Sequence, residues 1–408
     1  MSFLIQRLGH QGDGIAEGPV FAPLTVPGDI VTGVLNGTRL SEVRIETPSD
    51  DRVKPPCRHF KACGGCQLQH ASDAFVADWK VSVVRAALDA HGLSAPWLPI
   101  ATSPAQARRR ATLSARRTKK AAMAGFHGRA SDVIVEVPDC QLLHPDMMRA
   151  LPLAEDLAQQ TATRKGGLSV AVCLSAGGLD VQVSGGKDLD GPLRIILAQI
   201  AEAHDLARIA WADEIIATRR TPSQKFGAAS VTPPPGAFLQ ATAQGEAALL
   251  ADVMQITEGA GRIVDLFAGC GTFALPLCAT ARVHAAEGDA AMTEAMQAGW
   301  RKAEGLKQLS VEARDLFRRP LLPDEMAKFD AAVIDPPRAG AEAQVAELIT
   351  AGVPRIAYVS CNPVTFARDA AALVAGGYRI SQLRVVDQFR WSSHVELVAG
   401  FERISTKA

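Results

Sequence analysis

Features that are missing from the sequence narrow the classes of protein that it can encode. The apolar run from Leu266 to Ala281 is broken by Gly269, Gly271 and Pro276, whereas a membrane-spanning helix needs about 20 consecutive apolar residues. The residues Met1-Ser2-Phe3-Leu4 lead straight into polar sequence, without the basic and apolar regions of a signal peptide. We therefore expect a cytoplasmic protein with no membrane segment.

The sequence also has no excess of charge, because 43 basic residues balance 43 acidic ones among 408 residues. Net charge therefore gives no sign of a nucleic-acid partner, and only local patches can. Acidic residues are missing from the whole stretch Pro104 to Ala130. That stretch carries the basic residues Arg108, Arg109, Arg110, Arg116, Arg117, Lys119, Lys120 and Arg129. Two interpretations stay open, a solvated basic face and a face that binds phosphates.

We do not expect the eight cysteines to form a disulfide framework in a cytosolic protein of this size, so clustered cysteines indicate metal binding or catalysis. Cys57, Cys63 and Cys66 are spaced by five and two residues around Gly64-Gly65, and Cys140 lies far downstream. A structural zinc site usually shows two paired Cys-x2-Cys knuckles. The uneven spacing favours an iron–sulfur cluster, with zinc as the alternative.

The chain is long enough for two or three domains, and 48% apolar with 21% charged residues is typical of a folded protein. Residues 1–50 predict short strands separated by glycine turns, which favours a small barrel. Residues 51–232 mix strands with a helix over 74–91. After the linker Pro233-Pro234-Pro235-Gly236, residues 233–408 alternate strands and helices, which predicts a mainly parallel sheet covered by helices. The expected strands are 262–267, 282–287, 309–313, 330–334, 355–359, 382–387 and 395–401.

A glycine-rich turn follows the first of these strands, in the sequence Asp265 to Phe273. Its glycines let backbone amides approach a ligand closely. Glu287 ends the next strand, where a carboxylate can hold two ribose hydroxyls, and Asp315 follows the third strand, where it could receive an adenine amine. The turn also fits the fingerprint of dinucleotide enzymes. Asp265 favours S-adenosylmethionine (SAM) over NAD, because a carboxylate suits an ammonium group and repels pyrophosphate.

Two further motifs end the fourth and fifth strands, at the sheet edge where such folds bind ligands. In Asp335-Pro336-Pro337-Arg338, the carboxylate can accept a hydrogen bond from a base. In Ser360-Cys361-Asn362-Pro363, a thiolate can add to an electrophilic carbon. His394 and Glu396 alternate at the start of the last strand, so they are expected on one face, and either could act as a base.

Taken together, these motifs resemble those of the SAM-dependent RNA 5-methyluridine methyltransferases, and more closely the bacterial 23S rRNA uracil-5-methyltransferase branch that carries an iron–sulfur cluster. The resemblance covers nearly the whole chain. It implies an α/β fold, with a C-terminal Rossmann-like class I methyltransferase domain (233–408). A mixed α+β iron–sulfur domain (51–232) and a small N-terminal β-barrel of TRAM or OB type (1–50) precede it.

The resemblance also implies a role for each motif. Cys361 is the nucleophile that adds to carbon 6 of uracil, and Glu396 accepts the proton from carbon 5. The implied SAM-binding residues are Gln240, Asp265, Phe267, Gly269, Gly271, Thr272, Glu287, Asp315 and Asp335. The implied RNA-binding residues are Gln240, Asp335, Arg108, Arg109, Arg110, Arg116 and Arg117, and the ligands of the 4Fe–4S cluster are Cys57, Cys63, Cys66 and Cys140. We expect 23S rRNA as the partner and a monomer as the active form.

The chain departs from the family pattern at three places. Thr242 and Thr272 stand where asparagine is usual, and Arg390-Trp391 replaces part of a Phe-Pro-x-Thr motif. The motifs leave three alternative functions to compare. A tRNA substrate is the main alternative. A cytosine-5 methyltransferase is disfavoured because it would have a Pro-Cys pair where Pro336-Pro337 stands, and a non-catalytic iron–sulfur RNA-binding protein would not need Cys361 and Glu396.

Overall fold

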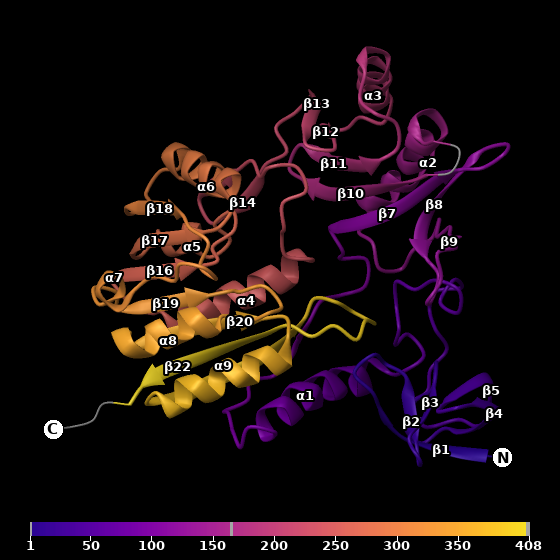
Figure 1. Ribbon diagram of the computed structural model, residues 1–408, viewed down its shortest axis with the longest axis horizontal. Coiled ribbons are helices and arrows are strands. Elements are labelled where there is room, and N and C mark those ends of the chain that lie inside the picture. Colours follow the sequence, from indigo (N-terminus) through magenta and orange to yellow (C-terminus); the bar gives the residue numbers. More distant parts are fainter. Residues whose placement is uncertain (1, 164–165, 405–408) are drawn as a thin grey trace.

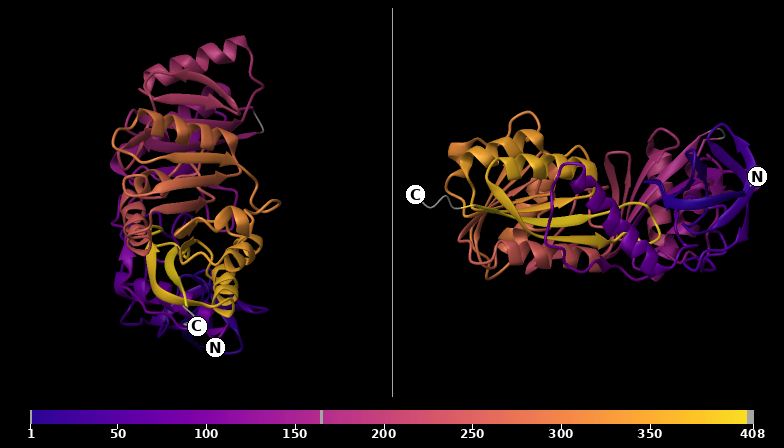
Figure 2. Two further views of the ribbon diagram at one scale, coloured as in Figure 1. Left: turned by 90° about the vertical axis from the view of Figure 1, so that its left-hand side faces the viewer. Right: turned by 90° about the horizontal axis from the view of Figure 1, so that it is seen from below.

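The computed structural model describes residues 2–163 and 166–404, which form an elongated molecule (Figure 1). A small barrel lies at the N-terminal end, and a large helix-covered sheet lies at the other end. The right-hand view of Figure 2, from below, shows the same order along the long axis. Among the described residues, no helix has both the length and the apolar character needed to cross a membrane.

The N-terminal barrel predicted from the glycine turns is confirmed as a closed five-stranded barrel. Its strand order is β1-β2-β3-β5-β4. The strands are β1 (Ser2–Leu8), β2 (Gly14–Ala16), β3 (Val20–Ala22), β4 (Ile30–Asn36) and β5 (Arg39–Thr47). Ile5, Val31 and Leu40 fill its interior. A glycine is required at the start of β2, because a Cβ on Gly14 would lie 2.0 Å from Thr25 Oγ1.

A seven-stranded sheet follows, with the order β13-β12-β11-β10-β7-β8-β9. The strands are β7 (Arg110–Arg117), β8 (Ala122–His127), β9 (Ile134–Val135), β10 (Gly167–Ser175), β11 (Gly178–Gly185), β12 (Arg208–Trp211) and β13 (Glu214–Thr218). The 3-10 helix η1 (Pro145–Arg149) and helices α2 (Ala150–Thr161) and α3 (Gly191–Ala203) accompany it. Alternation along β7 points Leu113 and Ala115 into the core with these helices, so Ser114 and Arg116 face the other way.

The third sheet has eight strands in the order β18-β17-β16-β19-β20-β22-β21-β6. They are β6 (Ala101–Thr102), β16 (Arg262–Leu266), β17 (Arg282–Glu287), β18 (Leu309–Ala313), β19 (Ala331–Ile334), β20 (Arg355–Ser360), β21 (Tyr378–Asp387) and β22 (Leu397–Arg403). Strands β16 to β20 pair in parallel, which confirms the predicted sheet, and β22 joins antiparallel between β20 and β21. A separate hairpin of β14 (Gln224–Phe226) and β15 (Ala229–Val231) precedes this sheet.

Helices cover both faces of this sheet. They are α4 (Ala243–Ile256), α5 (Ala274–Leu277), α6 (Ala290–Lys302), α7 (Pro323–Met326), α8 (Glu342–Ala351) and α9 (Pro363–Ala375). On one face, Ile356 and Tyr358 of β20 pack in a core with α8 and α9. On the other, Ala357 and Val359 pack in a core with α4, α5 and α6. This is the burial pattern expected of a central parallel strand.

Helix α1 (Asp73–Asp89) also packs on this sheet, against α9 and β21, and β6 pairs with the end of β21. Figure 1 shows α1 running beside α9, between the barrel and the sheet. The helix was predicted at 74–91, but no local pattern indicates that it packs against a strand some 300 positions further along. Segments 73–89 and 101–102 therefore connect the N-terminal half of the chain to the C-terminal sheet.

Candidate active site

A cavity of about 500 Å³ opens at the carboxyl ends of the parallel strands of the large sheet, where folds of this type bind their ligands. The structure brings most of the sequence-predicted site residues together there. Those that line the cavity are Gln240, Phe267, Gly269, Thr272, Glu287, Asp315, Asp335, Cys361 and Glu396. They come from the ends of five strands and from the segments before α4 and β22. One cavity therefore combines the glycine-rich turn, three acidic residues at strand ends and the cysteine.

The glycine-rich turn between β16 and α5 is held by the next strand. The N–H of Gly269 donates to Glu287 Oε2 at 2.9 Å, so the carboxylate at the end of β17 fixes the turn. Gly271 has φ +92°, and a Cβ there would lie 2.8 Å from Leu275. Phe267 also has a positive φ of 62°, which is strained for an aromatic residue. The backbone of this turn therefore forms part of the cavity wall.

Asp265 lies below this turn and, unlike Glu287, does not line the cavity. Its side chain is completely buried, and among the described residues neither carboxylate oxygen has a hydrogen-bond partner. Burial raises the pKa of Asp265 to about 8, because the charged form loses its hydration. A buried acceptor without a hydrogen-bond partner lowers the stability of the fold. Such an acceptor fits a site that binds a cationic ligand after the chain has folded.

Aromatic rings and Asp315 also line the cavity. Phe267 and Phe317 lie with their ring centroids 5.3 Å apart, and Phe317 is 49% exposed. Asp315 Oδ1 accepts the N–H groups of Phe317 and Arg318, at 3.0 and 3.3 Å. An exposed aromatic ring beside a carboxylate can hold a planar base with an exocyclic amine. Sequence analysis missed Phe317, although an aromatic residue two positions after Asp315 was visible.

Cys361 lines the same cavity as Asp335 and Glu396, close enough for both carboxyl groups to affect its thiol. Burial, together with the charges of Glu396 and Asp335, raises the pKa of the Cys361 thiol to about 11. Burial also raises the pKa of Glu396 to about 7 and that of Asp335 well above its usual value. Such raised carboxyl pKa values are typical of catalytic acids and bases. The thiol is protonated in the unliganded protein, and a positive charge nearby would favour the thiolate.

His394 and Glu396 do not share one face, contrary to the sequence-based expectation. Glu396 is 3% exposed and lines the cavity with Cys361, whereas His394 is exposed and lines a different cavity. Strand β22 begins only at Leu397. The twofold alternation of a strand therefore does not apply to residues 394–396.

The segment that carries Glu396 is held by α1 and by the loop after Cys66. Asp73, at the start of α1, accepts hydrogen bonds from the side chains of Arg390 and Trp391. The carbonyl of Trp391 accepts the N–H groups of Gln67 and Leu68, at 2.7 and 2.9 Å. The unusual Arg390-Trp391 pair therefore anchors this segment. Thr242, another departure, caps α4 by accepting the N–H of Gly245 at 3.0 Å.

The four clustered cysteines line a second cavity, of about 370 Å³. The four are Cys57, Cys63, Cys66 and Cys140. Burial and the neighbouring thiols raise the pKa of Cys66 to about 12. Among the described residues, no three His, Cys, Asp or Glu side chains are arranged to hold a single metal ion. A 4Fe–4S cluster distributes its four thiolates over four irons, so it accepts a wider ring of ligands than one zinc ion does.

The basic stretch is divided between two places. Arg109 is largely buried, forms an ion pair with Glu246 and donates to the carbonyl of Gln240. Arg110 stacks on Phe238 at the edge of the 500 Å³ cavity, with 4.3 Å between its guanidinium carbon and the ring centroid. Arg108 stacks on Phe389, a residue that lines both cavities.

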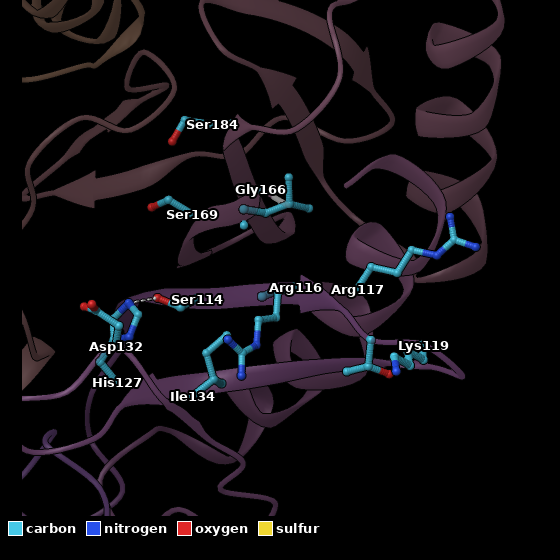
Figure 3. Close-up of a pocket in the computed structure, with 15 residues that line it drawn as sticks. Ser114, Arg116, Arg117, Lys119, His127, Asp132, Ile134, Gly166, Ser169 and Ser184 are labelled. Carbon is cyan, nitrogen blue, oxygen red and sulfur yellow. Dashed lines mark hydrogen bonds between the residues drawn. The ribbon is translucent and has the colours of Figure 1, made fainter. Parts of the chain in front are cut away.

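Arg116 and Arg117 lie at the other end of β7, and both are exposed. They border an open hollow of about 1180 Å³ on the sheet. Figure 3 shows them around it with Lys119 and with three serines, Ser114, Ser169 and Ser184. The serines are paired across neighbouring strands. The hollow is therefore polar and basic, as a phosphate-binding surface would be.

Comparison with known proteins identifies relatives over the full length of the chain. A sequence profile described as tRNA (Uracil-5-)-methyltransferase matches residues 232–403. An uncharacterized RNA methyltransferase of Rhizobium meliloti (strain 1021) is 42% identical over 98% of this chain and 98% of its own length. The 23S rRNA (uracil(1939)-C(5))-methyltransferase RlmD of Chromohalobacter salexigens is 32% identical over 96% of this chain and 87% of its own length.

A solved structure has the same fold. The tRNA (uracil-54, C5)-methyltransferase of Pyrococcus abyssi, in complex with S-adenosyl-L-homocysteine, superposes with a TM-score of 0.76. The match covers 98% of this chain and 99% of the other, at 23% identity. At this identity the likeness shows that the two folds correspond.

Proposed function

The chain belongs to the RNA uracil-5-methyltransferase family, and from this premise we propose that it transfers the methyl group of SAM to carbon 5 of one uridine in 23S rRNA through a covalent cysteine adduct. One observation carries the mechanism. Cys361 and Glu396, far apart in the sequence, line the same cavity as the glycine-rich turn and the acidic strand ends. A nucleophile, a base and a methyl-donor pocket therefore adjoin one another.

SAM supplies an electrophilic methyl group on a sulfonium. Carbon 5 of uracil is too weak a nucleophile to accept it directly. The Cys361 thiolate adds to carbon 6, so that carbon 5 gains electron density and attacks the methyl group. The bond between that methyl group and sulfur breaks, and a neutral thioether would leave. Glu396 then takes the proton from carbon 5, and the thiolate leaves carbon 6. The target base must leave its stack to reach this buried cavity.

The charges of the site explain when the thiolate forms. Burial keeps Cys361 protonated by raising its pKa to about 11, and the neighbouring Glu396 and Asp335 add to this shift. A bound sulfonium brings a positive charge to the cavity. Asp335 accepts N3–H of the base, which selects uracil and offsets the charge of this carboxylate. Both events lower the pKa of the thiol, so the nucleophile becomes active when both ligands are present.

The residues along the cavity suit SAM. Each Glu287 oxygen accepts one backbone N–H, from Gly269 or Asp289, and keeps a further lone pair for ribose hydroxyls. Asp315 accepts from the adenine amine, and Phe317 stacks on its ring. Asp265 attracts the ammonium group from below the turn, whose glycines and Phe267 shape the backbone around it. Thr272 and Gln240 complete the wall next to the methyl group. The cavity volume of about 500 Å³ lies within the usual range for ligands of this size.

The N-terminal barrel and the cysteine cavity have roles outside the chemistry. We propose that the barrel is a TRAM-type RNA-binding domain and that the four cysteines hold a 4Fe–4S cluster. The exposed Arg116 and Arg117, with Arg110 beside the cavity, bind phosphates of the substrate. Residues 1–50, 51–232 and 233–408 are the proposed domains, and a cytoplasmic monomer is the proposed active form.

A methylation assay tests the proposal. The purified protein is incubated with labelled SAM and either deproteinised 23S rRNA or bulk tRNA from a strain that lacks the gene, and the product is mapped by mass. We expect one 5-methyluridine in 23S rRNA. Methylation of tRNA alone would favour the alternative substrate, which the profile description and the Pyrococcus relative suggest. A 5-methylcytidine product would contradict the proposed reaction.

A further inference from the structure

Gln388 is a buried glutamine beside the proposed catalytic groups, and it is only 1% exposed. Its Oε1 accepts the backbone N–H of Ala241 at 2.7 Å. Its Nε2 donates to Gln240 Oε1 at 2.6 Å and to Glu396 Oε2 at 2.8 Å. One carboxamide therefore connects two cavity-lining side chains that lie more than 150 positions apart. Nothing in the reaction described above uses this residue.

The orientation of the Gln388 carboxamide follows from its neighbours. The backbone N–H of Ala241 can only donate, so the atom that faces it must be the oxygen. The nitrogen then faces Gln240 and Glu396, where it meets two oxygens. Exchange of the two atoms would place an N–H2 against an N–H and an oxygen against a carboxylate. The hydrogen-bond pattern therefore allows one orientation.

The orientation of Gln240 is fixed in turn. Because its Oε1 accepts from Gln388, its Nε2 points the other way. Gln240 lines the cavity together with Cys361 and Glu396, and its Nε2 is not among the enclosed polar atoms that lack a partner. Gln240 therefore presents two N–H donors to the cavity. Such a group favours a carbonyl oxygen on the ligand and opposes an amino group.

The position of this donor relative to the base follows from Glu396. Gln240 and Glu396 accept from the same nitrogen of Gln388, so they lie side by side on the cavity wall. Glu396 faces carbon 5, from which it takes the proton. Carbon 5 has two ring neighbours: carbon 6, to which Cys361 adds, and carbon 4. Carbon 4 carries a carbonyl acceptor in uracil and an amino donor in cytosine.

We propose that Gln388 is a positioning residue that sets the base preference of the cavity. It locks Gln240 with its N–H2 toward carbon 4 of the base, so that a carbonyl is accepted and an amino group is rejected. The same carboxamide holds the Glu396 carboxylate beside carbon 5. This inference rests on the proposed function and adds to it the residue that keeps Gln240 from turning over.

The test compares two substrates that differ at one atom. 4-Thiouridine keeps N3–H but carries sulfur, a weaker acceptor, in place of the oxygen on carbon 4. Single-turnover methylation is measured on RNA with uridine or 4-thiouridine at the target position. Gln388→Met removes all three hydrogen bonds at similar side-chain length and frees Gln240 to turn. We expect the uridine to 4-thiouridine rate ratio to fall about tenfold, which corresponds to the loss of one oriented hydrogen bond.

Two further variants keep the test decisive. In Gln388→Glu the carboxylate can still accept from the N–H of Ala241, but it can no longer donate to Gln240. Gln240 must then donate to this carboxylate, and its oxygen turns toward the base. The uridine to 4-thiouridine rate ratio should therefore fall as well. Gln344→Met is the matched control, because Gln344 is also 1% exposed and hydrogen-bonds to the backbone of Leu321. It should lose stability but keep the wild-type ratio.

The outcomes separate this inference from the proposed function. If the wild-type protein does not methylate uridine in RNA, the proposed function fails. If it does, and a folded Gln388→Met or Gln388→Glu protein keeps the wild-type ratio, the positioning role of Gln388 is wrong while the proposed function stands. A changed ratio in Gln344→Met would equally overturn it, because the effect would then follow from general destabilisation.

Discussion

Lys80 and Asp387 form an ion pair in which both side chains are buried, with 2.5 Å between Lys80 Nζ and Asp387 Oδ1. Lys80 also donates to the carbonyl of Phe389 at 3.0 Å. Burial lowers the pKa of Lys80, and the charge of Asp387 opposes this shift. Helix α1 thus holds the beginning of the segment that ends at Glu396. Either charge without the other would be left uncompensated in the interior.

The first prediction concerns this pair. Lys80→Met should lower the free energy of unfolding by about 3–5 kcal/mol, because it leaves Asp387 buried without its partner. It should also slow methylation, since the Glu396 segment loses an anchor. Urea unfolding measures the first effect. Lys119→Met, at an exposed position on the same chain, should cost less than about 0.5 kcal/mol. If Lys80→Met lowered the free energy of unfolding as little as Lys119→Met, the ion pair would contribute little to stability.

The second prediction concerns SAM binding. Glu287→Ala should raise the Kd for SAM by about tenfold or more, because it removes both the ribose acceptor and the hydrogen bond that fixes Gly269. Calorimetric titration with SAM measures the change. RNA binding should stay nearly unchanged, and Glu294→Ala on the exposed side of α6 serves as the control. Tighter binding of NADH than of SAM by the wild-type protein would overturn the cofactor assignment.

The third prediction concerns the cysteine cavity. Protein purified without oxygen should be brown and contain about four irons per chain. Cys63→Ser should lose most of this iron and unfold at a lower temperature, because cluster binding is coupled to folding. Cys173→Ser, at a half-buried cysteine outside this cavity, should keep its iron. One zinc per chain without visible absorption would contradict the cluster.

The fourth prediction separates the arginines of the basic stretch. Arg116→Glu and Arg117→Glu should weaken RNA binding and flatten its dependence on salt, since exposed phosphate contacts are lost. Arg109→Glu should instead destabilise the fold, because Arg109 is paired with Glu246. Filter binding over a range of salt concentrations and thermal unfolding distinguish the two effects. If Arg116→Glu left the salt dependence of RNA binding unchanged, this surface would be a solvated basic face that does not bind phosphates.

The sequence predicted what local patterns determine. Strands β17 and β18 have the predicted bounds, because short apolar runs between turns define them. The cavity residues came together because each follows a parallel strand, and such strands end at one edge. Lys80 and Gln388 could not be found in this way. Their importance depends on contacts with Asp387 and Gln240, which only the folded chain creates. The shared face expected for His394 and Glu396 was wrong because β22 starts later.

The last prediction separates Cys361 from Glu396 by the step that each serves. Cys361→Ala cannot form the adduct, so no methyl group should be transferred. Glu396→Gln should still allow addition and methyl transfer, because both precede proton removal. Its product should remain attached to the protein, and a denaturing gel should show a slower band with label from both RNA and SAM. A Cys361→Ala protein that stays active would refute the covalent mechanism.

The pH dependence of the wild-type enzyme gives a second test of the same assignment. Glu396 must be ionised to accept the proton, and burial holds its pKa at about 7. The rate at which the methylated adduct resolves should therefore rise about tenfold per pH unit below pH 7 and level off above it. Rapid-quench measurement of the adduct follows this step. Resolution that is independent of pH between 5 and 8, or normal turnover in Glu396→Gln, would assign the proton to another group. His394 would be the first candidate. Because it lines the cysteine cavity rather than the one that holds Cys361, His394 would have to act through water.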